Sequence, residues 1–217
     1  MSLDGPRLAP ASGGPAKSLV ILLHGYGSNG EDLIGLAPYW QRLLPDTAFA
    51  SPNAPQECPG APMGYQWFPI TRLDPDEAYK GVSAAMPILN AFIDEELEKH
   101  GLDESNLVLV GFSQGTMMSL HTGLRRDKQL AGILGFSGAL AGPQHLEAEI
   151  KSRPPVLLIH GDQDPMIPVQ AMFTAVDELG KVDTPVQSHV SPGVPHSIGP
   201  DGLELGGKFV ATHLANA

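Results

Sequence analysis

The sequence has a single cysteine, Cys58, among its 217 residues. One thiol cannot form an intramolecular disulfide, and no cluster of cysteines is present to hold zinc, so a buried core must stabilise the fold. A lone cysteine also suits a reducing compartment, which predicts a cytoplasmic protein. No apolar run approaches the ~20 residues of a membrane span, and no signal peptide is expected at the N-terminus.

Basic residues are scarce as well, with 13 Lys and Arg against 24 Asp and Glu and a formal net charge of −11. Such a charge repels phosphate groups, so we expect neither nucleic acid nor an anionic lipid surface as partner. A small neutral molecule remains compatible with this charge. Hydrophobic residues make up 42% of the chain, which excludes disordered and collagen-like classes and predicts one domain over residues 1–217.

Short and nearly continuous apolar runs recur along the chain. They are Leu19–Leu23, Leu107–Val110, Ile133–Phe136 and Val156–Ile159. Val186–Val190 is one more candidate strand outside this set. Apolar residues that are continuous rather than alternating are typical of parallel strands covered on both faces.

Helical patterns separate these runs. Apolar residues from Val82 to Leu97 recur every three to four positions, although Pro87 interrupts them and predicts a kink or a later start. Further helices are expected over Gln114–Arg125, Ala171–Leu179 and Gly202–Leu214. Alternating strands and helices predict an α/β fold with a mostly parallel sheet and helices on both faces, and residues 51–70 form its one long loop.

A Gly-x-Ser-x-Gly pattern surrounds Ser113, directly after an apolar strand and before a helix. A nucleophilic serine needs a sharp turn that lifts its hydroxyl clear of the sheet, and glycines on either side make room for that turn. The pattern alone is weak in a chain with 25 glycines. Its position between strand and helix makes Ser113 the candidate nucleophile.

A serine nucleophile requires a histidine base and a carboxylate that orients it, and in this fold they follow the serine in the order acid, then histidine. Asp162 and Asp164 both follow the strand Val156–Ile159, and the residues alone do not separate them. Of the two later histidines, His189 lies within a candidate strand. His196 lies in the loop before the last helix, and this loop position favours it as the base.

Backbone amides are expected to hold the negatively charged oxygen of the reaction intermediate. One donor is the N–H of Gln114, directly after the nucleophile, and the other is the N–H of Tyr26, in a glycine-rich turn after the first strand. His24 in the same turn is expected to brace it. The remaining histidines show no ligand spacing, so we expect no metal and no other cofactor.

Together these segments resemble the phospholipase/carboxylesterase family of α/β-hydrolases, which includes the acyl-protein thioesterases. The resemblance rests on Leu23–Gly27, Pro52–Pro55, Trp67, Gly111–Gly115, His160–Pro168 and His196. It implies an α/β-hydrolase fold without a separate cap domain and a triad of Ser113, Asp164 and His196. It favours Asp164 over Asp162, because the family's acid directly precedes a proline.

The resemblance also implies an acyl groove. We expect Trp67 and Phe68 to contact the substrate there, with packing in the core as the alternative for Trp67. Two positions depart from the family pattern. Tyr26 stands where an aliphatic residue is common, and Phe68 and Pro69 replace the Tyr-Asp of the thioesterase branch. These departures favour a narrower or more polar pocket and disfavour protein deacylation.

The leading hypothesis is therefore a serine carboxylesterase that hydrolyses short-to-medium acyl esters. An acyl-protein thioesterase or a lysophospholipase is the alternative within the same chemistry, and a binding protein that keeps the fold without turnover is the alternative outside it. A dienelactone-type hydrolase is disfavoured because that group carries cysteine at the position of Ser113. An exposed apolar rim at Trp67 and Phe68 would favour a homodimer.

Overall fold

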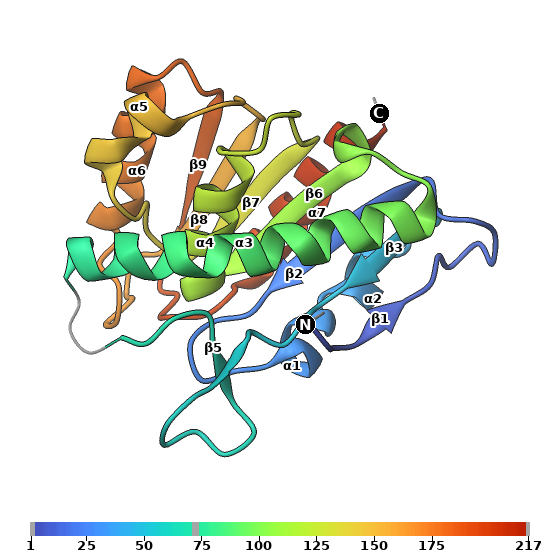
Figure 1. Ribbon diagram of the computed structural model, residues 1–217, viewed down its shortest axis with the longest axis horizontal. Coiled ribbons are helices and arrows are strands. Elements are labelled where there is room, and N and C mark those ends of the chain that lie inside the picture. The colour runs from blue at the N-terminus through green and yellow to red at the C-terminus, as the bar shows by residue number, and fades with distance from the viewer. Residues whose placement is uncertain (1–2, 71–73, 216–217) are drawn as a thin grey trace.

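A seven-stranded sheet forms the centre of the computed structural model, which describes residues 3–70 and 74–215 (Figure 1). Its strand order is β1-β3-β2-β6-β7-β8-β9. These strands are β1 (Arg7–Leu8), β2 (Ser18–Leu23), β3 (Thr47–Ala50), β6 (Leu107–Phe112), β7 (Gly132–Phe136), β8 (Val156–Gly161) and β9 (Val186–Ser191). All neighbours pair in parallel except the short edge strand β1, which is antiparallel to β3. The mostly parallel sheet confirms the prediction.

The continuous apolar runs are explained by two cores, one on each face of the sheet. Alternate residues of β2 point in opposite directions, so Ile21 packs into one core and Leu22 into the other. Every residue of β2, β7 and β8 is buried. A strand covered on both faces needs apolar residues at nearly every position. The sequence shows such continuous apolar runs rather than an alternation of apolar and polar residues.

Helices cover both faces, as predicted. The first core is closed by α3 (Pro75–His100), α4 (Gln114–Gly123) and α6 (Gln170–Lys181). The second is closed by α1 (Gly30–Ile34), α2 (Ala37–Trp40) and α7 (Pro200–Leu214). In Figure 1 the long helix α3 crosses in front of the sheet, while α7 lies behind it.

Helix α3 differs from the prediction, which expected Pro87 to kink the helix or to delay its start. It begins at residue 75, earlier than the apolar pattern, because Asp74 caps it by accepting a hydrogen bond from the Asp76 amide at 2.9 Å. It also continues through Pro87 without a break. Buried residues on both sides of the proline, among them Val82, Leu89 and Ile93, hold the helix against the sheet. Tertiary contact thus outweighs the lost backbone hydrogen bond.

Several short elements were not predicted. Strands β1 and β3 and helices α1 and α2 have too few residues to give a clear period. Residues 51–70 are mostly loop but contain the hairpin β4 (Gln56–Glu57) and β5 (Tyr65–Gln66). The remaining elements are the 3-10 helices η1 (Glu104–Asn106) and η2 (Pro143–His145) and the helix α5 (Leu146–Glu149).

The carboxyl ends of the parallel strands meet at one edge of the sheet, and the loops there carry every residue that sequence reasoning selected. In open α/β sheets this edge is where ligands bind. Within the described residues, no helix is both long and apolar enough to cross a membrane.

Candidate active site

Ser113 lies on a sharp turn between β6 and α4, and its backbone is strained. Its φ of 55° and ψ of −115° are angles that residues with a side chain rarely adopt. The turn is fixed on both sides: the Ser113 amide donates to the carbonyl of Phe136 at 2.9 Å, and its carbonyl accepts from the Thr116 amide at 3.0 Å. The predicted turn is therefore present, with the serine at its tip.

The glycines on either side of the serine are required by close backbone contacts. A Cβ added to Gly115 would lie 1.8 Å from the carbonyl oxygen of Leu23, and one added to Gly111 would lie 2.4 Å from the Gly115 backbone. Neither position has room for any side chain. The glycines of the Gly-x-Ser-x-Gly pattern are thus required because the turn packs tightly against itself and against the neighbouring strand β2.

Asp164 lies in the loop after β8, and its side chain has no exposed surface. One oxygen, Oδ1, accepts hydrogen bonds from the amides of Met166 at 2.8 Å and Ile167 at 2.9 Å. The other, Oδ2, lies 2.6 Å from Nδ1 of His196. Burial alone would raise the pKa of Asp164, but these hydrogen bonds outweigh it and hold the pKa below its usual value. Asp164 therefore stays ionised at neutral pH.

The ring of His196 reaches the serine turn from the loop before α7. Its centre lies 4.9 Å from the ring centre of Phe112, the residue before Ser113. Among the described residues, no hydrogen bond joins the Ser113 hydroxyl to His196. In the absence of substrate such catalytic hydrogen bonds are often long, and they tighten when the complex forms. The structure thus brings the three predicted residues into one region and pairs two of them directly.

The two alternative candidates have other partners. Asp162 accepts a hydrogen bond from the Gly193 amide at 2.6 Å and so braces the loop that leads to His196. His189, on strand β9, pairs through Nε2 with Oδ2 of Asp201 at 2.7 Å. Both residues are therefore engaged away from Ser113.

The amides of Tyr26 and Gln114 are free to bind a ligand. Across the described parts of the chain, neither N–H donates a hydrogen bond to the protein. The first residues of a helix leave their amides unpaired, which accounts for Gln114 at the start of α4. Gly25, next to Tyr26, lies so close to Ser113 that an added Cβ would be 3.2 Å from Cβ of Ser113. Both candidate donors thus lie next to the serine turn.

His24 braces the turn that carries Tyr26, as expected. Its ring is fully buried; Nδ1 lies 2.7 Å from the carbonyl of Gly25, and Nε2 lies 2.9 Å from the amide of Ala54, which donates to it. Burial lowers the pKa of His24, so the ring stays neutral with its proton on Nδ1.

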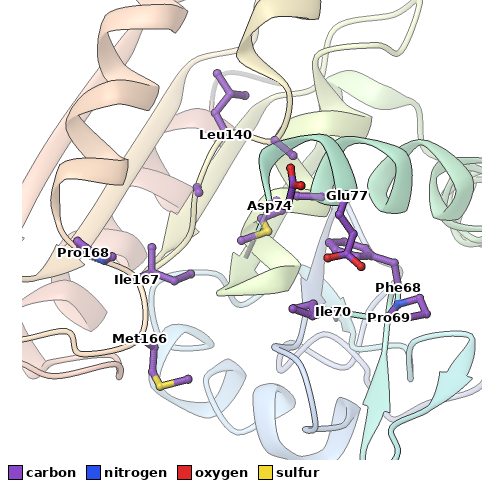
Figure 2. Close-up of a pocket in the computed structure, with 13 residues that line it drawn as sticks. Phe68, Pro69, Ile70, Asp74, Glu77, Leu140, Met166, Ile167 and Pro168 are labelled. Atoms are coloured by element: carbon purple, nitrogen blue, oxygen red, sulfur yellow. The ribbon is translucent and has the colours of Figure 1, made fainter. Parts of the chain in front are cut away.

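A mostly apolar pocket opens beside the serine turn. Figure 2 shows the side chains of residues 166–168 on one side of it and those of residues 68–70 on the other, with Asp74 and Glu77 nearby. Its volume is about 220 Å³. The pocket adjoins the candidate triad, because Met117 is one helical turn after Ser113 and the amides of Met166 and Ile167 bind Asp164.

Trp67 and Phe68 lie in different places, which corrects part of the prediction. Phe68 lines the pocket, as expected. Trp67 is not among the lining residues; it is 1% exposed, and its indole N–H donates to the carbonyl of His24 at 3.0 Å. With Phe68 only 3% exposed, the expected apolar rim at these two residues is absent. The homodimer stays a prediction without that support.

Sequence reasoning missed two side chains that hold the site together. The Gln114 side chain bonds to the backbone of Trp67 and Phe68. His160, at the end of β8, donates from Nε2 to the carbonyl of Ile167 at 2.8 Å and lies 3.3 Å from Oδ2 of Asp164. Both residues are part of the segments that carried the resemblance, but no periodicity or spacing assigns these contacts.

Comparison with known proteins agrees with this geometry. Residues 9–214 match the phospholipase/carboxylesterase family. This chain belongs to that family. Acyl-protein thioesterase 1 of Kluyveromyces lactis is 34% identical over 182 residues, which cover 78% of this chain and 79% of that protein. Acyl-protein thioesterase 1 of Saccharomyces cerevisiae is 30% identical over 99% of this chain and 100% of its own length.

Among solved structures, the esterase PE8 superposes with a TM-score of 0.95 and is 46% identical, covering 99% of this chain and 100% of that one. Membership in the phospholipase/carboxylesterase family makes the protein an α/β-hydrolase-fold enzyme that hydrolyses ester or thioester bonds. Within the described ranges, no group of three or more His, Cys, Asp or Glu side chains is arranged to hold a metal ion.

Proposed function

We propose that this member of the phospholipase/carboxylesterase family is a serine carboxylesterase that hydrolyses short-to-medium acyl esters. Ser113 is the nucleophile, His196 the general base and Asp164 the residue that orients it. The observation that carries the proposal is the strained backbone of Ser113, held between the unpaired amides of Tyr26 and Gln114. Strain of this kind persists only where the surrounding structure enforces it, and it is common at active sites.

The reaction proceeds through an acyl-enzyme. The Ser113 oxygen attacks the ester carbonyl while Nε2 of His196 takes its proton, and the amides of Tyr26 and Gln114 bind the oxygen that becomes negative. His196 then returns the proton to the leaving alcohol as its bond to the acyl carbon breaks. Water enters, gives a proton to His196 and attacks the acyl carbon, and Ser113 leaves with that proton restored. Asp164 stays ionised and stabilises the charged imidazole.

Replacing the nucleophile tests this proposal directly. Ser113→Ala removes one oxygen and should abolish ester turnover and labelling by a fluorophosphonate, because no other group replaces the hydroxyl. Ser137→Ala is the matched control: like Ser113, Ser137 has a positive φ, of 46°, and follows a strand of the sheet, although Ser137 is fully buried and Ser113 is only partly buried. Turnover of the Ser113→Ala protein close to that of the wild type would refute the assignment.

The pocket supports the acyl-length part of the proposal. Its volume of about 220 Å³ lies below the ~300–1,000 Å³ of pockets that enclose drug-sized ligands. A short or medium acyl chain fits such a space, whereas a long chain has to extend beyond it. We expect kcat/KM for 4-nitrophenyl esters to rise from acetate to a maximum at a medium chain and then fall.

Acyl-protein thioesterase activity is the second candidate. The curated relatives at 30–34% identity carry that name, which favours it. A lysophospholipase needs the same long-chain capacity. If palmitoyl esters and thioesters were hydrolysed faster than medium-chain ones, this alternative would replace the short-to-medium assignment.

We also propose that the enzyme acts in the cytoplasm. The support is chemical: Cys58 is unpaired, and the sequence has no second cysteine with which it could form the intramolecular disulfide that is common in oxidising compartments. Localisation of a fluorescently tagged chain in its native host tests this placement, and a signal from outside the cytoplasm would overturn it.

A further inference from the structure

Among the residues that the structure describes, the backbone amide of Gln114 is unpaired, but the side chain of the same residue is held by two hydrogen bonds. It is 1% exposed. Its Oε1 accepts a hydrogen bond from the amide of Trp67 at 2.9 Å, and its Nε2 donates to the carbonyl of Phe68 at 2.8 Å. Residue 114 thus fixes a loop 46 residues earlier in the chain through both ends of its amide group. A carboxamide offers one acceptor and one donor in this arrangement at every pH, whereas a carboxyl group does so only when protonated.

The same loop is also tied to the other candidate oxyanion donor. The indole N–H of Trp67 donates to the carbonyl of His24 at 3.0 Å. The His24 ring in turn is fixed to the carbonyl of Gly25, next to Tyr26. A continuous chain of buried contacts therefore runs from the start of α4, through residues 67 and 68, to the turn that presents the Tyr26 amide.

Phe68 carries this arrangement into the acyl pocket. Its ring lines the pocket and presses against helix α3, where a Cβ added to Gly81 would lie 2.3 Å from the Phe68 ring. Phe68 is thus confined between α3 and the Gln114 side chain. Any shift of its backbone moves the pocket wall and the nucleophile turn relative to each other.

We propose that the Gln114 side chain is a positioning residue that couples the acyl pocket to the oxyanion hole. It keeps residues 67 and 68 at one distance from the nucleophile turn. The amides of Tyr26 and Gln114 and the pocket wall at Phe68 therefore keep a single geometry. Because a shift of about 1 Å in a reacting group can slow catalysis by about 100-fold, this coupling governs both rate and chain-length preference. The inference rests on the proposed carboxylesterase activity.

The first test replaces Gln114 with Met, which has a similar length and can make neither hydrogen bond. For Gln114→Met we expect kcat to fall about 10- to 100-fold, with a smaller change in KM for the acetate ester. We also expect the preference for medium over acetyl chains to flatten, because Phe68 is no longer held. Unchanged kcat together with an unchanged chain-length profile would overturn the proposal.

A matched control separates positioning from simple loss of stability. Ser18→Ala removes a buried hydrogen bond to Thr47, at the end of β2 opposite the active site. It should lower the thermal transition while leaving kcat and chain-length preference as in the wild type. If Ser18→Ala altered catalysis as much as Gln114→Met does, stability rather than positioning would explain the effect.

The second test uses Gln114→Glu, because the pH dependence of its activity distinguishes a positioning role from a purely structural one. An ionised carboxylate can still accept from the Trp67 amide, but its second oxygen faces the carbonyl oxygen of Phe68 and repels it. The protonated acid can donate to Phe68 and restores the native pattern. Burial favours this neutral form. The kcat/KM of Gln114→Glu divided by that of the wild type should therefore rise as pH is lowered from about 8 to about 6.

Taking this ratio removes the titration of groups that both proteins share. A ratio independent of pH would overturn the proposal. Failure of the underlying function is distinguishable, because a wild-type protein that hydrolyses no ester in the panel refutes the carboxylesterase assignment before any Gln114 variant is compared.

Discussion

Nδ1 of His196 lies 2.6 Å from Oδ2 of Asp164, and this carboxylate has no exposed surface. The pair joins two loops that are 32 residues apart in the chain. A buried carboxylate with two amide donors on its other oxygen can accept a proton from the imidazole only at great cost. It therefore fixes the ring orientation, and in the proposed mechanism Nε2 is left to exchange the proton of Ser113.

Replacing the two aspartates of this loop should give opposite results. Asp164→Asn keeps the shape but favours the wrong imidazole tautomer, and kcat should fall by about 10³- to 10⁴-fold with little change in KM. Asp162→Asn keeps an oxygen that accepts from the Gly193 amide, so its kcat should stay near that of the wild type. Steady-state kinetics on one 4-nitrophenyl ester measure both. Equal losses in the two variants would contradict the assignment of Asp164.

The crowding at Gly115 should appear as a loss of stability. In Gly115→Ala the new methyl group would lie 1.8 Å from the Leu23 carbonyl oxygen, and we expect a loss of about 3 kcal/mol or more in the free energy of unfolding. Gly180→Ala, in helix α6, meets nothing within 4 Å and should stabilise by about 0.5 kcal/mol. Urea unfolding compares the two, and a stable Gly115→Ala protein would show that the turn is less tightly packed than described.

The acyl pocket should discriminate against chains that end in a negative charge, because Asp74 and Glu77 line it. We expect kcat/KM for a glutarate mono-ester to be about 5-fold below that for the neutral pentanoate ester of the same alcohol, since a like charge nearby costs about 1 kcal/mol. Asp74→Asn with Glu77→Gln should reduce this difference, and Asn still caps α3.

The matched control for charge is Glu98→Gln with Glu204→Gln, two exposed positions outside the pocket lining. This variant changes the net charge by as much as Asp74→Asn with Glu77→Gln does. It should leave the difference in kcat/KM between the two esters unchanged. Added salt should weaken the wild-type discrimination. If both double variants reduced it to the same extent, overall charge rather than the pocket would be responsible.

His121 should make the fold sensitive to mild acid. Burial, with the nearby charge of Arg125, lowers the pKa of His121 from 6.5 to about 4, although Glu149 opposes the shift. The unfolded chain takes up this proton near pH 6.5 and the folded protein only near pH 4. The unfolded state thus binds more protons between these values, and the free energy of unfolding should fall as pH is lowered through that window.

Urea unfolding at pH 7, 6 and 5 measures this dependence, and His121→Gln should make it shallower. His24, also buried with a lowered pKa, contributes in the same direction, so some dependence remains in the variant. An identical pH dependence in the wild type and in His121→Gln would show that His121 does not cause it.

The sequence predicted the parts of the fold that follow from burial on a regular element. Continuous apolar runs located β2, β6, β7 and β8 to within two residues, because a strand covered on both faces has nowhere to place polar groups. Strand β9 was predicted to within one residue although it is only partly buried and has no such run. The sequence predicted helix α3 too short, since the start of the helix is fixed by the Asp74 cap and not by apolar spacing. Strand β3, four residues long, carried no period that could reveal it.

At the site, the sequence selected candidates whose position in the chain limits the role that each can have. Ser113 had to sit between strand and helix, and His196 had to lie in a loop. The choice between Asp162 and Asp164 depended on which carboxylate turns toward the histidine, and loop geometry decides that. The same holds for Trp67, which we expected in the pocket wall and which instead points its indole N–H inward to His24. Contacts between distant loops, such as that of the Gln114 side chain, leave no local pattern.

The backbone of Ser113 sets stability and catalysis against each other at one position. A φ of 55° with ψ of −115° suits glycine far better than serine, so glycine there would relax the chain and remove the hydroxyl in the same step. Selection for thermal tolerance alone would thus act against the proposed nucleophile. A more heat-resistant form that still works has to draw its added stability from elsewhere in the sheet and helices.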